Sequence, residues 1–341
     1  MSTTETKPTV QFVSLAPDAP DDAPELTGEP LSRPKFLALV GSLTAVILPF
    51  LGLIAASILF WDTRFSWLNL GMMLGGYFIT LLSVTVGFHR LFTHKSFKTN
   101  RVVTAILGVL GSMAIEGSII DWVAIHRRHH QHTDRPDDPH SPNLHGSGFR
   151  SWLSGMIHAH FGWFFAPAPT KEQMDRYVPD LQADPLVVAI SRMFGFWAIL
   201  GLVIPGVIAF AVTHSWMGAL MGFIWGGLLR VFLVHHVSWS VNSICHLWGS
   251  QPFDTHDYSR NNSIFGILAL GEGWHNTHHA FPTSARHGIE KWQFDISYFF
   301  IRGLALLGLA SDIKLPSPER IAAKRNKAET PAKPDATKAP N

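Results

Sequence analysis

The stretch SWLNLGMMLGGYFITLLSVTVGFHRLFTH (66–94) decides the fold, because an apolar segment runs without a break into a pair of histidines. The apolar part, 66–88, is long enough to cross a hydrocarbon core, which takes about 20 helical residues. His89 and His94 follow where such a helix would leave the lipid. The sequence therefore predicts a membrane protein with a polar site at the edge of the bilayer.

Three further stretches are long and apolar enough to cross a membrane, namely 36–60, 186–212 and 216–234. Together with 66–88 they form two pairs, each joined by a very short link. The composition agrees, with 47% hydrophobic and 15% charged residues. We expect an all-α integral membrane protein with four transmembrane helices in two hairpins, rather than a soluble protein with a buried helical core.

The segment between the two pairs, from 89 to about 185, is rich in Arg and Lys, whereas the short links contain only Arg64. This asymmetry predicts that the segment and both chain ends are cytoplasmic, in a bacterial plasma membrane. The apolar run 102–120 is expected to be a helix that lies along the membrane face or packs under the histidine site, and 297–310 a similar helix. The residues outside the spans should therefore form a helical cytoplasmic cap.

The two ends of the chain differ in composition from the rest. Residues 1–34 are rich in Pro, Asp, Glu and Thr, and 315–341 in Lys, Ala and Pro. Both are predicted to be disordered tails, and the first carries no signal-peptide pattern. The membrane domain is then expected at 35–314.

Nineteen histidines are many for a chain of 341 residues. Neutral imidazole is the commonest protein ligand for transition metals, so the excess suggests a metal site. The single cysteine, Cys245, excludes a disulfide framework and a cysteine-based zinc or iron–sulfur site. A net charge of +2 gives no argument for a nucleic-acid partner.

The histidines gather in three clusters, which are HRLFTH (89–94), HRRHH (126–130) and HNTHH (275–279). Offsets of three and four place imidazoles on one face of a helix. Eight histidines oversupply one zinc ion but suit two metal ions, and imidazole suits iron. The sequence therefore predicts a site for two metals. Nearby carboxylates that could orient the rings are Glu116, Asp121, Asp134, Asp137 and Asp138.

These clusters, together with NSICHLWG (242–249), RNN (260–262) and GEGWHNTHHAFP (271–282), resemble the acyl-CoA delta-9 desaturases, membrane di-iron enzymes of the stearoyl-CoA desaturase type. The resemblance covers about residues 36–310. It implies two iron ions held by nine histidines, with one asparagine that reaches iron through a water. Carried onto this sequence, that set is His89, His94, His126, His129, His130, His246, His275, His278, His279 and Asn242.

The resemblance also implies a reaction, the O2-dependent conversion of a saturated acyl chain into a cis-delta-9 unsaturated one. Two electrons would come from an external donor, such as a ferredoxin or a b5-type protein with its reductase. The chain would lie in a narrow, bent tunnel, for which the candidate lining residues are Trp122, Trp239 and Trp274, with Met73 and Tyr77 as closure points. Hydroxylases share the three clusters and are an alternative, whereas a metal transporter would need ligands inside the spans.

The resemblance implies an acyl-CoA substrate, with a membrane glycerolipid as the alternative carrier of the acyl chain. In the animal acyl-CoA enzymes an Arg-Asp pair precedes the second cluster and holds the CoA head group, whereas this chain has Ala124 and Ile125 there. A second basic pair of that family is also absent after Trp163. Either CoA is held by other cations, or the acyl chain arrives on a membrane glycerolipid. The candidate cations are Arg127, Arg128, Arg150 and Lys171.

Two more histidines, His235 and His236, lie at the end of the fourth apolar stretch, near Arg230. They belong to none of the three clusters. We interpret them as structural, or as groups that orient the ligands.

Overall fold

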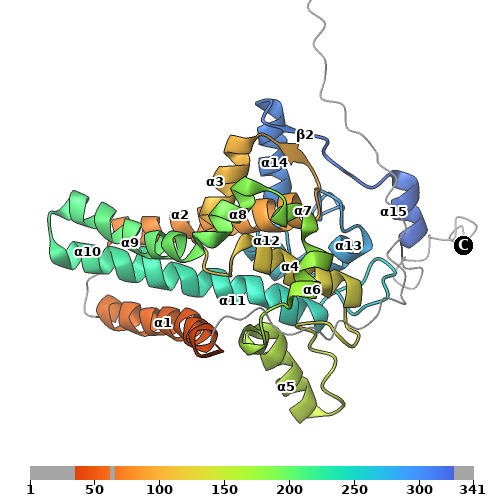
Figure 1. The fold of residues 1–341 in the computed structure, drawn as a ribbon, viewed down its shortest axis with the longest axis horizontal. Coiled ribbons are helices and arrows are strands. Elements are labelled where there is room, and N and C mark those ends of the chain that lie inside the picture. The colour runs from red at the N-terminus through yellow and green to blue at the C-terminus, as the bar shows by residue number, and fades with distance from the viewer. Residues whose placement is uncertain (1–34, 62–65, 326–341) are drawn as a thin grey trace, which may run out of the picture.

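The computed structural model describes residues 35–61 and 66–325, and these residues are mostly helical (Figure 1). The longer helices are α1 (Lys35–Trp61), α2 (Trp67–Ser83), α3 (Arg101–Ser112), α4 (Ile119–His132), α5 (Phe149–His160), α9 (Phe194–Thr213), α11 (Arg230–Ser243) and α14 (Ile296–Leu306). The shorter ones are α6 (Lys171–Tyr177), α7 (Pro179–Gln182), α8 (Pro185–Arg192), α10 (Trp216–Gly222), α12 (Ser263–Leu268), α13 (His275–Ala280) and α15 (Pro318–Lys324). Two π-helices, η1 (Val84–Thr93) and η3 (Phe223–Leu229), and two 3-10 helices, η2 (Gly162–Phe165) and η4 (Ile244–His246), continue neighbouring helices or link them.

In the described residues, four helices are long and apolar enough to cross a membrane, covering Leu39–Leu59, Trp67–Thr93, Phe194–Thr213 and Trp216–His246. They lie side by side on the left of Figure 1. α9 packs closely on α10, where a Cβ on Gly222 would approach the Pro205 carbonyl oxygen to 2.4 Å. The prediction of an all-α membrane protein with four transmembrane helices is confirmed.

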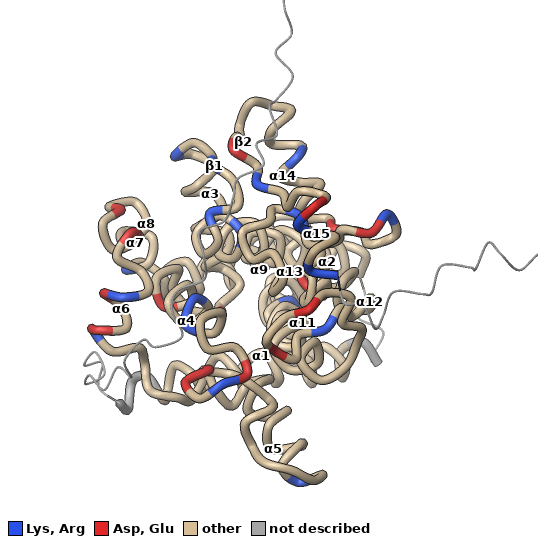
Figure 2. The backbone as a smooth tube through the Cα atoms, turned by 90° about the vertical axis from the view of Figure 1, so that its right-hand side faces the viewer, with Lys and Arg blue, Asp and Glu red and all other residues tan. Residues whose placement is uncertain are grey.

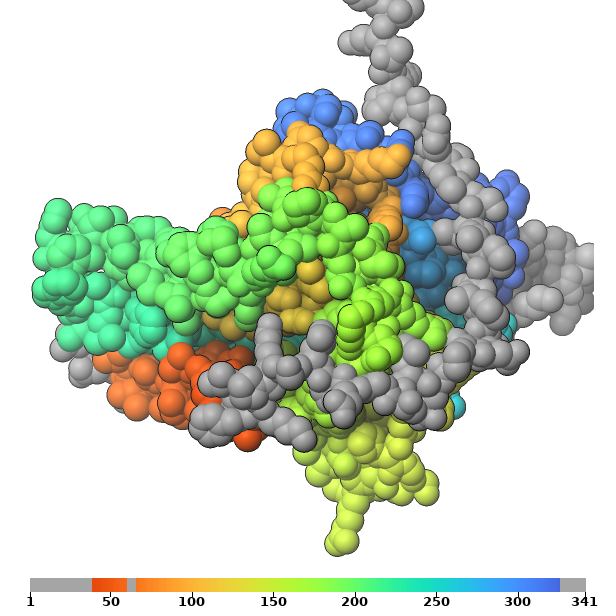
Figure 3. All heavy atoms as spheres, in the orientation of Figure 1, coloured from red at the N-terminus to blue at the C-terminus, as the bar shows by residue number. Residues whose placement is uncertain are grey.

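The remaining helices gather at one end of the spans and form the cap, with α5 projecting from it (Figure 3). Its core joins the second span to the cap through fully buried residues such as Phe88, Ile119 and Ile301. A two-stranded antiparallel ladder, β1 (Lys98–Thr99) with β2 (Ala310–Ser311), ties the end of the second span to the chain that follows α14. The cap is thereby fixed against the ends of the spans.

The spans differ from the predicted boundaries. The predicted third span, 186–212, contains two helices, because Asp184 caps α8 through the amides of Leu186 and Val187 and a new helix begins at Phe194. The second span runs on to Thr93 and the fourth to His246. These extensions place His89 and His246 on helices continuous with the second and fourth spans.

The predicted disordered tail from 315 begins too early. Residues Pro318–Lys324 form α15, the Lys324 Nζ donates to the Ala280 carbonyl at 3.0 Å, and the Asp254 amide donates to the Lys324 carbonyl at 2.8 Å. A basic composition suggested a solvated tail, but these contacts hold the helix beside α13. The rest of that predicted tail, 326–341, and the other, 1–34, lie outside the described residues.

The predicted surface helices within 102–120 and 297–310 are α3 and α14. α3 exposes Val102 (67%) and Ile106 (50%), and α14 exposes Phe299 (58%) and Leu306 (74%). One-sided exposure of large apolar side chains is what a helix on a membrane face requires.

Candidate metal centre

The first pair of histidines is His89 on the π-helix η1 and His94 at its C-cap, and the helix type explains their spacing. The His94 amide donates to the His89 carbonyl at 3.1 Å, a bond between residues five apart. This geometry brings the two imidazoles together, with ring centroids 4.7 Å apart. A spacing of five that would diverge on an α-helix therefore converges here.

The second and third clusters lie on α4 and α13. Ser118 caps α4 through the Asp121 amide, and Trp122, one turn before the ligand positions, stacks on His126 with ring centroids 4.8 Å apart. The short α13 is held by the residues between its histidines. Asn276 exchanges two hydrogen bonds with the backbone of Phe253, at 2.9 and 3.1 Å.

The RNN motif (260–262) contributes a second clamp on α13. The Thr277 amide donates to Asn261 Oδ1 at 3.0 Å, and Asn261 Nδ2 donates to Thr277 Oγ1 at 2.9 Å. The third residue of the motif, Asn262, caps α12. The motif therefore orients the histidine helix without contributing a ligand.

All nine predicted histidines converge into two groups, in each of which the ligand atoms lie within 4.8 Å of one another. Cluster A contains His89, His94, His126, His130 and His278. Cluster B contains His129, His246, His275 and His279. Helices α4 and α13 contribute to both clusters, so the two groups adjoin.

The ring nitrogens of these clusters have the arrangement that a cation would satisfy. His246 Nδ1 faces the Asp134 carboxylate at 2.9 Å and so carries the proton, which leaves its Nε2 as a bare acceptor. That Nε2 lies 2.9 Å from the Nε2 of His275. In cluster A, the Nε2 of His278 lies 3.0 Å from that of His89 and 2.9 Å from that of His130.

Other ring nitrogens are buried and lack a hydrogen-bond partner among the described residues, including the Nε2 atoms of His94, His129 and His279. Unpaired buried acceptors are costly unless a ligand or ion meets them. The donor set of five and four imidazoles therefore fits two metal ions of the kind that imidazole prefers, such as iron.

Four carboxylates face the outer ring nitrogens of these histidines. Asp138, Asp134 and Asp257 lie 2.9 Å from the Nδ1 of His129, His246 and His279, and Glu272 lies 2.7 Å from the Nδ1 of His89. Such partners fix the tautomer and orientation of a metal-binding histidine. Asp134 and Asp138 were among the predicted candidates, whereas Asp257 and Glu272 were missed.

The aspartates of cluster B are ionised by these contacts. Burial alone would raise the pKa of Asp257, but His279 and a hydrogen bond from Ser259 lower it below its usual value. Asp134 behaves in the same way, since burial opposes the lowering of its pKa by His246. Both therefore offer a negative charge to the metal centre at neutral pH.

Glu272 belongs to a buried ionic group that the sequence did not predict. Its carboxylate accepts from Arg90 Nη2 at 3.1 Å, and Arg90 also pairs with Asp295 at 2.9 Å. His287, fully buried, lies 3.2 Å from Glu272 Oε2 through its Nδ1. Glu272 therefore links one histidine of cluster A to a charged network on the opposite side.

Burial favours the neutral form of four of these histidines. Burial lowers the pKa of His126 and His278 well below the usual value, and the neighbouring His89 lowers it further. His130 and His275 follow the same pattern. Neutral imidazole is the form that binds metals.

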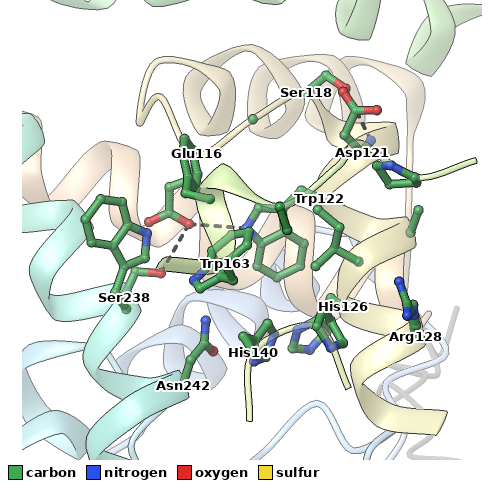
Figure 4. A pocket seen from close by; sticks show the side chains of 18 of the residues that line it. Glu116, Ser118, Asp121, Trp122, His126, Arg128, His140, Trp163, Ser238 and Asn242 are labelled. Atoms are coloured by element: carbon green, nitrogen blue, oxygen red, sulfur yellow. Dashed lines mark hydrogen bonds between the residues drawn. The ribbon is translucent and has the colours of Figure 1, made fainter. Parts of the chain in front are cut away.

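A cavity of about 1100 Å³ reaches the metal centre, where His89, His126 and His275 line it (Figure 4). Its volume is large for a small-molecule site. Two of the predicted tunnel residues, Trp122 and Trp239, line it, as does Asn242. An elongated substrate could therefore pass close to both clusters.

The other predicted tunnel residues, Trp274, Met73 and Tyr77, do not line this cavity in the described part of the chain. Trp274 Nε1 donates to the Phe294 carbonyl at 2.7 Å, and Tyr77 donates to the Leu268 carbonyl at 2.7 Å. Met73 packs in a separate apolar cluster with residues of α1 and η3. Closeness to the ligands in the sequence did not predict the direction in which these side chains point.

Glu116 lies in the cavity wall, where Figure 4 shows it between Trp122 and Ser238. Its Oε2 accepts from Trp122 Nε1 at 3.2 Å and from Ser238 Oγ at 3.1 Å. Burial raises the pKa of Glu116 to about 7, although both hydrogen bonds act in the opposite direction. Of the other predicted carboxylates, Asp121 accepts from Ser118 and Asp137 pairs with Arg128. In the described part of the chain, Glu116, Asp121 and Asp137 belong to none of the histidine groups.

The four cations considered for a CoA head group are mostly engaged elsewhere. Arg127 binds Asp180 and the carbonyls of Phe92, Thr93 and Tyr177. Lys171 pairs with Asp175 on α6, and Arg150 is exposed on α5. Only Arg128, itself paired with Asp137, lines the cavity.

His235 and His236 take no part in either cluster. His235 Nε2 lies 3.0 Å from the Ala114 carbonyl and 3.1 Å from that of Ile115, which pins the turn before α4. His236 Nδ1 lies 2.9 Å from His160 Nε2 on α5. Their positions support the structural interpretation.

Comparison with known proteins adds a family. A family model described as fatty acid desaturase matches residues 65–293. A hex-5-enoyl-acyl-carrier-protein acetylenase of Moorena producens is 41% identical over 82% of this chain and 87% of its own length. An sn-1 stearoyl-lipid 9-desaturase of Anabaena variabilis is 39% identical over 78% of this chain and 92% of its own. The delta-9 acyl-lipid desaturase 1 of Arabidopsis thaliana is 37% identical over 83% and 85%.

Proposed function

Because the chain belongs to the fatty acid desaturase family and is an oxidoreductase that desaturates fatty acyl chains, we propose that it introduces a cis-delta-9 double bond with two iron ions held by clusters A and B. The observation that carries the proposal is the convergence of nine imidazoles, seven of them buried, beside one large cavity. Cluster A would hold one ion and cluster B the other, and Asn242 would reach an iron through a water.

The chemistry that bound iron supplies is the activation of dioxygen and the removal of one hydrogen from each of two adjacent methylenes. Each double bond consumes one dioxygen, two electrons and two protons and releases two waters. The residues of this chain hold the acyl segment at the metals and exclude water from it. Trp122, which both lines the cavity and stacks on His126, is suited to fix that segment beside cluster A.

The electrons come from a separate donor, such as a ferredoxin or a b5-type protein with its reductase. In Figure 2, which faces the cap, basic and acidic residues are intermixed around α4, α6 and α15. The cap and both termini lie on the cytoplasmic side of a bacterial plasma membrane in this proposal.

For the acyl carrier, two candidates follow from the sequence, CoA and a membrane lipid. Ala124, Ile125 and the engagement of Arg127 and Lys171 do not favour CoA. Relatives named as acyl-lipid desaturases favour the lipid. We therefore place the membrane lipid first.

Expression in a bacterial host that lacks desaturases, with a ferredoxin and its reductase, tests the proposal. Gas chromatography with mass spectrometry of the extracted acyl chains should show a new monounsaturated species with its double bond at carbon 9. The His278→Ala variant, produced at the same level, should show none. A hydroxylated product in place of the unsaturated one would identify a hydroxylase instead.

A further inference from the structure

The cavity at the metal centre has an opening whose position does not follow from the proposed reaction. Besides the residues at the metal centre, its described lining includes Gly41, Ser42 and Ala45 of α1 and the segment 166–169 that follows η2. The Ser42 hydroxyl donates to the Phe164 carbonyl at 2.8 Å, so these two parts of the chain adjoin. Between them lies one end of the cavity.

Exposure locates the opening at this end. Of the described residues that line the cavity, only Gly41, Ala166, Pro167 and Ala168 are exposed, and those at the metal end are buried. A lining residue that is also exposed marks the rim of an opening. The route into the cavity therefore passes between the first turns of α1 and the segment 166–169.

The chemistry of this rim excludes a highly charged carrier. The four exposed residues are small and uncharged, and the only cation in the described lining, Arg128, is paired with Asp137. A phosphate-rich carrier such as CoA needs cations where its head group lies. No described residue of the rim supplies one.

The surroundings of the rim are apolar. Gly41 lies within the span Leu39–Leu59, whose helix exposes Leu43 (39%) and Ile47 (48%) close by. On the other side, Phe165, directly before Ala166, is 40% exposed. Large exposed side chains of this kind suit contact with lipid.

We infer that the acyl chain enters from the bilayer through this opening, and that its carrier is a membrane glycerolipid whose head group stays at the rim. The inference rests on the proposed desaturase function with its lipid carrier, and adds the route by which the acyl chain reaches the metal centre. A chain that enters sideways need not leave the lipid, which avoids exposing its methylenes to water.

Cysteine chemistry tests the route, because the native Cys245 is fully buried and would not react. Ala168→Cys places a thiol on the rim, and Ala183→Cys places one on an exposed residue after α7 that does not line the cavity. The iron-loaded variants, in vesicles that contain distearoyl phosphatidylglycerol, are treated with a bulky methanethiosulfonate. Desaturation by modified Ala168→Cys should fall to less than about a tenth and recover with reductant, while Ala183→Cys is unchanged.

Photo-cross-linking gives a readout that needs neither iron nor electrons. A phosphatidylglycerol with a photoreactive group beside its glycerol should label the peptides that contain Gly41 or Ala168. Unchanged lipid desaturation by modified Ala168→Cys, or labelling elsewhere only, would overturn the route, and desaturation of stearoyl-CoA but not of lipid would overturn the carrier. Labelling at the rim without desaturation of either substrate would instead contradict the proposed function and leave the route standing.

Discussion

Clusters A and B supply the same kind of ligand atom, a histidine ring nitrogen, but the protein positions these rings in different ways. In cluster B three of the four rings face an aspartate each, and Asp134, Asp138 and Asp257 all come from loops of the cap. In cluster A only His89 has a carboxylate partner, Glu272. Cluster A instead relies on helix geometry, with the π-helical His89 and His94 and the i, i+4 pair His126 and His130. Helix packing therefore orients one half of the site, and hydrogen bonds orient the other.

Removing one ligand from either cluster should have the largest effect and tests whether the two clusters are separate. His278→Ala in cluster A and His275→Ala in cluster B should each lower activity by at least about a hundredfold, because each opens the coordination of one metal. If the clusters hold separate ions, each variant should lose about half of the bound iron, measured per chain by elemental analysis. The exposed His256→Ala is the matched control. Complete loss of iron from either variant would show that the clusters form one cooperative site.

Removing one orienting carboxylate from each cluster gives the next effect. Asp257→Asn and Glu272→Gln should each weaken iron binding by about 10–100-fold, since the histidine loses a charged partner. Glu272→Gln should also destabilise the fold by about 1–3 kcal/mol, because Arg90 keeps only Asp295 as an anionic partner. Thermal unfolding of the metal-free proteins separates the two outcomes.

The exposed Asp254→Asn, in the same loop as Asp257, is the control for that pair. Equal losses of thermal stability in the Asp257 and Glu272 variants would contradict the distinction between the clusters. It would mean that the Arg90 network does not depend on Glu272.

The part of the site that the sequence predicted follows the same division between helix geometry and hydrogen bonds from loops. Ligands repeated at helical offsets, such as His126 with His130, were predictable because helix periodicity alone brings them together. Asp257 was missed because it lies 22 residues from His279 and reaches it through a loop whose path no local pattern encodes. Glu272 stood in the quoted motif GEGWHNTHH, but its partner His89 is on another helix.

The fold shows the same limit. Four spans were predictable from length and hydropathy, yet the surroundings that each face of those helices meets were not. Met73 and Tyr77 were assigned to the tunnel from their spacing on one helix face, whereas α2 turns Met73 towards α1 and η3 and Tyr77 towards α12. Since lipid, protein and cavity are all apolar surroundings, an apolar pattern does not distinguish them.

The smallest expected effect concerns Glu116, which contacts Trp122 and through it only cluster A. Burial raises the pKa of Glu116 to about 7, so the folded chain keeps this proton to higher pH than the unfolded chain does. The group therefore favours folding most at low pH, and its contribution falls as pH rises from about 4.5 to about 7. Glu116→Gln cannot ionise, so it should stabilise the protein by about 1–3 kcal/mol at pH 8 and not at pH 4.5. Thermal unfolding at the two pH values measures this difference, and Glu172→Gln, exposed on α6, should show none. An equal gain at both pH values would mean that the carboxyl of Glu116 does not titrate in the folded wall of the cavity.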